Sequence, residues 1–203
     1  DFNDYSRINK LFNTVVVILL NSICVVVVFS KKEKIFLFGI GLKKITIVGN
    51  VWITFAITIA VSLAYAFSMN FLLRFMPDGI TMAGSAYAGK GAIAIPSVLI
   101  FAFIKTALSE EIIFRGFLLK RLKSKFGFVV ANTVQALLFG LLHGVPFALA
   151  TKSILVFVLY TILPGLFGWY HGWLNEKRFS DSILPSWMLH GTLNAIVAII
   201  GLW

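Results

Sequence analysis

Five long stretches without charged residues constrain the fold of this chain more than any other feature. Asp, Glu, Lys and Arg are missing from 11–30, 45–73, 126–151, 153–175 and 182–203, and the shortest of these holds 20 residues. A helix needs about 20 apolar residues to cross the hydrocarbon core of a bilayer. The whole chain has 59% hydrophobic and 13% charged residues, whereas soluble domains carry about 25% charged residues. We therefore predict a polytopic membrane protein, which excludes a secreted disulfide scaffold, a soluble dinucleotide-binding enzyme and a disordered tail.

The hydropathy pattern predicts an all-α transmembrane bundle with an intramembrane cavity. We expect one integral membrane domain over residues 1–203, with about six membrane helices at 11–30, 45–73, 92–119, 128–143, 153–174 and 185–203. Cys24 is the only cysteine, so neither an intrachain disulfide nor a thiolate metal site is expected.

The net charge of +10 would suggest nucleic acid in a soluble chain, but here we assign it to loops and expect no nucleic-acid partner. Eleven lysines and arginines lie in the connections between helices 1–2, 3–4 and 5–6, against five on the opposite side. The positive-inside rule then places these three connections in the cytoplasm and both ends of the chain outside.

The third expected span carries Lys105, Glu110, Glu111 and Arg115 within an otherwise apolar run. Each ionisable residue at a helix centre costs about 2.5–3.5 kcal/mol on insertion scales, so we expect all four to point into the bundle. Glu111 and Arg115 are spaced i,i+4 and can pair. Glu110 is rotated by about 100° and is expected to face a cavity. The alternative is a charge-neutralising network without chemistry.

Three histidines add to this pattern. His143 is followed by Gly144 and Pro146, which are expected to interrupt or end its helix. His190 and Asn194 are spaced i,i+4 and face the same direction. His171 precedes a charged loop, and we interpret it as a structural residue at an interface.

A carboxylate with two imidazoles suits the activation of water. The carboxylate accepts a proton from water, an imidazole orients the water, and a second imidazole with an amide can stabilise an oxyanion. The same donors could instead ligate a catalytic zinc with an open position. The residue types alone leave both possibilities open.

Three motifs occur in order on predicted helices: EExxxR at 110–115, FxxxH at 139–143 and HxxxN at 190–194. This ordered triple resembles the CAAX protease and bacteriocin-processing family, which is related to the type II CAAX prenyl endopeptidase. The family-like core covers approximately 92–203, and residues 1–91 would add two preceding helices and a loop. The resemblance implies an intramembrane endopeptidase in a bacterial cell membrane that acts on a peptide or a membrane protein.

The resemblance also implies roles for the motif residues. Glu110 and His143 would activate the hydrolytic water, and His190 and Asn194 would form the oxyanion site. Glu111 and Arg115 would support them. Members are commonly labelled metalloproteases, and a zinc would be held by Glu110, His143 and His190, but Asn194 suits an oxyanion better than a metal and favours the metal-free reading. The alternatives are a non-catalytic immunity or scaffold protein and, less favoured, a transporter or proton pathway.

The motifs set one geometric requirement. In straight helices, His143 would lie about 23 Å and His190 about 8 Å above the start of its helix, which is too uneven for one site. We therefore expect that the fourth helix begins well outside the hydrocarbon boundary, or that 144–165 is broken or tilted, with Pro146 and Pro164 as break points.

Overall fold

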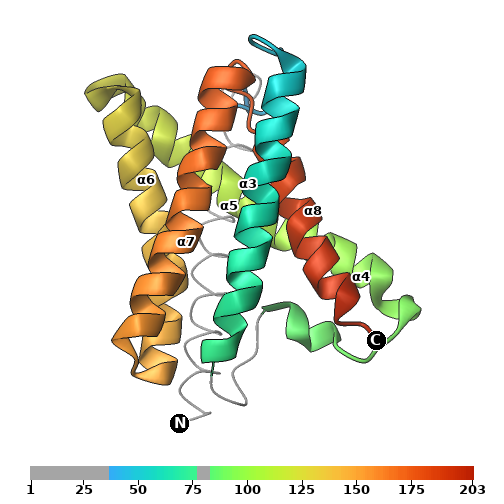
Figure 1. Cartoon of the computed structure of the whole chain (residues 1–203). Helices are drawn as coiled ribbons and strands as arrows, with labels where there is room; N and C mark the ends of the chain where they lie inside the picture. The colour runs from blue at the N-terminus through green and yellow to red at the C-terminus, as the bar shows by residue number, and fades with distance from the viewer. Residues whose placement is uncertain (1–36, 77–82) are drawn as a thin grey trace, which may run out of the picture.

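The computed structural model describes residues 37–76 and 83–203, and within these residues the chain is helical without a strand. The expected span at 11–30 and Cys24 lie outside the described residues. The α-helices (Figure 1) are α3 (Val51–Leu72), α4 (Ile95–Leu99), α5 (Ser109–Glu111), α6 (Lys120–Thr151), α7 (Ile154–Trp173) and α8 (Leu184–Ile200). Shorter 3₁₀ segments are η1 (Leu73–Phe75), η2 (Ala83–Tyr87) and η3 (Ala92–Ala94), and π-helical segments are η4 (Ile100–Leu108), η5 (Ile112–Leu119) and η6 (Leu174–Arg178).

Within residues 37–76 and 83–203, three helical runs are long and apolar enough to cross a membrane. They are Val51–Phe75, Ala92–Thr151 and Ile154–Arg178, while Leu184–Ile200 is a shorter apolar helix. Large apolar side chains lie exposed along these runs, including Phe67 on α3 and Ile154 on α7. An apolar outer surface of this kind is suited to contact with lipid rather than with water.

The 60-residue run contains two of the expected spans, 92–119 and 128–143, and the connection between them is helical instead of a loop. Gly127 interrupts the run with a non-helical backbone at φ 76° and ψ 171°, a conformation open to glycine. The chain changes direction there, which divides the run into a first arm before Gly127 and a second arm after it. In Figure 1 the arm through α4 and α5 crosses obliquely behind the upright α3, whereas the arm of α6 runs alongside α7.

The prediction that the helix ends or breaks after His143 is wrong. α6 continues through Pro146 to Thr151, and α7 contains Pro164 without a break. The tilted elements that the site requires are instead the arm before Gly127 and α8 (Figure 1).

The second arm of α6 packs closely against α7. A Cβ atom at Gly140 would lie 2.2 Å from the carbonyl oxygen of Thr161, and one at Gly144 would lie 1.9 Å from the Thr161 hydroxyl. Small residues let membrane helices approach this closely. This close packing accompanies the continuation of α6 through Pro146 to Thr151.

The three expected basic connections meet at one end of the molecule. Lys43 pairs with Asp181 at 3.8 Å, Lys120 pairs with Glu176 at 2.9 Å, and Lys123 pairs with both acids. The pKa of the Asp181 carboxyl lies below its ordinary value, first through hydrogen bonding with Glu176 and then through the bond from Lys123. These ion pairs hold the starts of α6 and α8 and the end of η6 together.

Candidate active site

The first motif lies where the first arm changes its helical geometry. Ser109, Glu110 and Glu111 form the single α-turn of α5 between the π-helical segments η4 and η5, and all three residues are buried. π-helical turns are frequent at functional sites. The expectation that all four charged side chains face the bundle is wrong for Lys105. Its side chain is exposed and its ammonium group lies 5.6 Å from the centre of the Phe101 ring, because the long alkyl stem lets it extend outward.

The Glu111 carboxylate is the centre of the site. Its Oε1 accepts a hydrogen bond from His171 Nδ1 at 2.9 Å and one from His190 Nδ1 at 3.1 Å, and it lies 3.3 Å from Arg115. Its Oε2 accepts a hydrogen bond from the Ser186 hydroxyl at 2.6 Å. The predicted pairing of Glu111 with Arg115 is confirmed. Both carboxylate oxygens are thus used within the protein.

Arg115 brings the compensating positive charge into the same buried place. Its side chain is fully buried, and the guanidinium lies 4.2 Å from the centre of the Phe139 ring. A Cβ atom at Gly168 would lie only 2.8 Å from the guanidinium, so the glycine of α7 provides the space for it. Phe139 is the first residue of the second motif, and its ring also covers the arginine of the first motif.

Glu110 faces His190 across the site. Glu110 Oε2 lies 3.7 Å from His190 Nε2, and each residue keeps 8% of its surface exposed. The Nδ1 of His190 donates to Glu111, so its Nε2 is the nitrogen that faces Glu110. An imidazole oriented by one carboxylate and facing a second one is suited to proton transfer.

α8 reaches this position because Gly191 leaves room for the first arm. A Cβ atom there would lie 2.3 Å from the Phe103 ring, and the Trp187 indole N–H donates to the Phe103 carbonyl at 2.7 Å. One turn after His190, Asn194 Nδ2 donates to the Thr106 hydroxyl at 3.1 Å. His190 and Asn194 therefore face the same arm, as the i,i+4 spacing predicts.

His143 lies at the partly exposed edge of the site. Its Nδ1 donates to the Phe139 carbonyl at 2.9 Å, so the lone pair is on Nε2. The Phe139 ring lies 4.6 Å from the His143 ring and 6.1 Å from the His190 ring between centroids. Within the described part of the chain, His143 makes no hydrogen bond to Glu110 or His190, and Phe139 is the side chain that links the two imidazoles.

The interpretation of His171 as an interfacial residue is wrong. His171 is fully buried and bonded to Glu111, because η6 continues the helix for five residues beyond α7 and places the charged residues farther from the site. Sequence analysis also missed Asn175 and Ser186, which are fully buried and bonded to each other at 2.6 Å. The one available signal was a polar residue within an apolar stretch.

A different trio from the predicted one has the geometry of a possible metal site. Glu111, His171 and His190 have ligand atoms within 4.8 Å of one another, and such a group could hold a metal ion. The residue types fit zinc, but the bonding does not. Both oxygens of Glu111 already accept hydrogen bonds, and the buried Arg115 guanidinium lies 3.3 Å from one of them. A divalent cation there would displace these donors next to a fixed positive charge.

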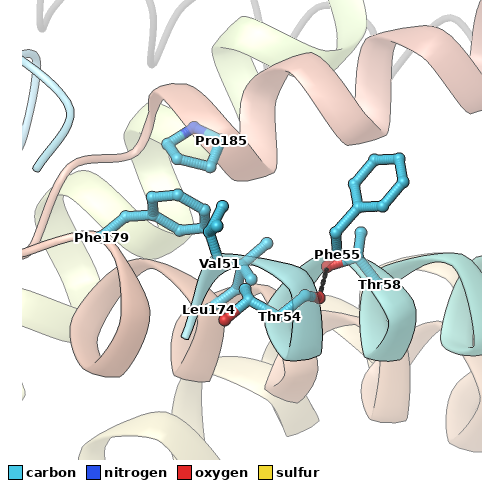
Figure 2. A pocket seen from close by; sticks show the side chains of 7 residues that line it. All are labelled: Val51, Thr54, Phe55, Thr58, Leu174, Phe179 and Pro185. Atoms are coloured by element: carbon cyan, nitrogen blue, oxygen red, sulfur yellow. Dashed lines mark hydrogen bonds between the residues drawn. The ribbon is translucent and has the colours of Figure 1, made fainter. Parts of the chain in front are cut away.

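A pocket of about 150 Å³ lies beside the network on the α3 side. Figure 2 shows its apolar lining, in which Thr58 donates to the Thr54 carbonyl. Leu174 and Pro185 of the lining directly precede Asn175 and Ser186 in the sequence. None of the seven lining residues is titratable, so this pocket is separate from the acid–base groups. The lining residues are Val51, Thr54, Phe55, Thr58, Leu174, Phe179 and Pro185.

Comparisons with known proteins agree with the motifs. A family model described as type II CAAX prenyl endopeptidase Rce1-like matches residues 92–196, which contain all three motifs. No curated protein and no solved structure matches the chain. The matched region covers more than half of the chain and includes every described residue whose side chain forms a hydrogen bond or ion pair with Glu111. The chain is thus a member of the Rce1-like family of CAAX intramembrane endopeptidases.

Proposed function

We propose that this protein is an intramembrane endopeptidase that hydrolyses a peptide bond with water activated by Glu110. The observation that carries this proposal is the facing pair of Glu110 and His190, in which Glu111 fixes the orientation of the imidazole. A buried carboxylate oxygen that has no hydrogen-bond partner among the described residues, as in Glu110 Oε2, is a base available for a substrate water.

In the proposed reaction, Glu110 takes a proton from water while the lone pair on His143 Nε2 orients the same water. The hydroxide adds to the carbonyl carbon and forms a tetrahedral oxyanion. Glu110 passes this proton to Nε2 of His190, and the resulting N–H and the second amide hydrogen of Asn194 donate to that oxygen. The proton then returns through Glu110 to the leaving amine, and the carbon–nitrogen bond breaks. Mass and charge balance with water as the only co-reactant.

This mechanism uses no metal. A zinc ion would supply a Lewis acid and a bound hydroxide, but Glu111, the carboxylate of the Glu111, His171 and His190 trio, is already bonded within the protein. We propose that Glu111 and Arg115 support the acid–base residues instead.

We propose that the substrate is a peptide or a membrane protein and that cleavage takes place within one integral domain of a bacterial cell membrane. The end of the molecule that carries Lys43, Lys120 and Lys123 would face the cytoplasm, since basic residues concentrate there. Glu110 and His190 keep a small exposed surface, which marks the side from which water and substrate arrive.

The test is cleavage of a peptide library by the purified protein, read by mass spectrometry, with and without a chelator. The wild type is expected to cleave in both conditions, and Glu110→Gln is expected to lose about 10²-fold or more in kcat/KM. Glu176→Gln, the same substitution at a buried ion pair at the basic end, is the matched control. Full activity of Glu110→Gln would refute the proposed base, and loss of wild-type activity in chelator would refute the metal-free mechanism.

A further inference from the structure

His171 belongs to none of the three motifs, yet it makes the shortest contact of any imidazole with the Glu111 carboxylate. Its Nδ1 lies 2.9 Å from Glu111 Oε1, compared with 3.1 Å for His190 Nδ1. Two imidazoles from α7 and α8 therefore share one oxygen, and their ring centroids lie 5.7 Å apart. A change at His171 reaches His190 through a single carboxylate.

The surroundings of His171 leave this bond as its main role. The ring is fully buried and lies 4.2 Å from the Phe167 ring between centroids. Its Nε2 has no hydrogen-bond partner within the described residues, so this nitrogen takes part in no relay there. Its one hydrogen bond among the described residues goes to Glu111, so the ring is placed to act through that carboxylate.

The other side of Glu111 is held in the same way. The Ser186 hydroxyl donates to Oε2 at 2.6 Å and in turn accepts from Asn175 Nδ2 at 2.6 Å. Ser186 fixes one oxygen from α8 and His171 fixes the other from α7, so the carboxylate plane cannot rotate. A carboxylate that cannot rotate fixes which nitrogen of His190 carries the proton.

We propose that His171 is a positioning residue, which holds Glu111 from α7 so that Glu111 presents the Nε2 of His190 to Glu110. Without this donor, Glu111 turns toward the space left by the ring, and His190 loses its single tautomer. The inference rests on the proposed function for its effect on catalysis, but not for its effect on the tautomer.

Two substitutions of His171 separate positioning from packing. His171→Asn keeps an N–H donor near the position of Nδ1, whereas His171→Leu has a similar buried volume and no donor. The matched control is Thr161→Val, a nearly isosteric change on the same helix, at a hydroxyl without a hydrogen-bond partner in the described residues. We expect His171→Leu to lose at least about 10-fold in kcat with KM within about twofold. We expect His171→Asn to stay within about threefold of the wild type.

The tautomer is measured independently of cleavage. The chain has three histidines, so ¹⁵N-histidine labelling gives three pairs of ring nitrogens, which His143 and His171 substitutions assign. We expect His190 to carry its proton on Nδ1 in the wild type and in His171→Asn, and to populate both tautomers in His171→Leu. An unchanged His190 spectrum in His171→Leu would overturn the inference. The expected spectra together with an inactive wild type would instead refute the proposed function.

Elemental analysis of the same preparations tests the competing role. Stoichiometric zinc in the wild type that disappears together with activity in His171→Asn would make His171 a metal ligand and overturn the positioning role. Activity of His171→Asn without bound metal supports positioning.

Discussion

Replacing Arg115 by Met tests the charge balance of the buried site. The guanidinium is fully buried and lies 3.3 Å from Glu111 Oε1. At an effective dielectric constant of about 20, two unit charges at that distance attract each other by about 5 kcal/mol. Removing one partner of a buried pair typically costs about 3–5 kcal/mol because the other charge stays buried and unpaired. The Phe139 ring adds about 2 kcal/mol of cation–π attraction to the loss.

The double variant Glu111→Gln/Arg115→Met separates charge from packing. We expect it to be more stable than the sum of the two single variants by about 3 kcal/mol, since neither charge remains unpaired. Unfolding in mixed micelles, followed by tryptophan fluorescence, measures the free energies. Arg121→Met is the matched control, because Arg121 is exposed on α6, and it should change stability by less than about 0.5 kcal/mol. Strict additivity of the two single variants would refute the reasoning.

Two further predictions concern packing and pH. Gly140→Ala places a Cβ atom 2.2 Å from the Thr161 carbonyl and should cost about 1–3 kcal/mol of unfolding free energy. The control, Gly39→Ala, places a Cβ atom that meets nothing within 4 Å and should cost less. Equal losses in the two variants would refute the close packing. Asp181→Asn should cost about 0.5–1 kcal/mol at neutral pH. Because the folded pKa of Asp181 is lowered, this contribution to stability is present above about pH 4 and is lost as the pH falls further. The melting temperatures of wild type and variant should therefore converge in acid. A difference that persists in acid would contradict the ion-pair origin.

The ionisable residues of the third span show where local sequence spacing is sufficient. Glu111 and Arg115 pair because four residues bring two side chains to one helix face, whatever the rest of the chain does. Lys105 lies on the same helix, but its exposure depends on which face of the arm the other helices cover. Helical spacing does not contain that information.

His171 and His143 show the same limit of prediction from local sequence. Their surroundings are set by helices distant in sequence: Glu111 lies 60 residues from His171, and α6 continues beyond Pro146 alongside α7. The extra turns of η6 change the depth of His171 by continuing a helix where charged residues predict its end. The error for His171 came from assigning its depth by its sequence neighbours.

The sequence by itself determined the membrane class and the family and named the motif residues, because hydropathy, charge and motif spacing are local properties. The tertiary structure decided which of these residues share a carboxylate. Glu111 became the centre of the site only when α7 and α8 brought His171, His190 and Ser186 to it. Contacts of this kind depend on the crossing of helices that glycines allow, and no local pattern specifies that crossing.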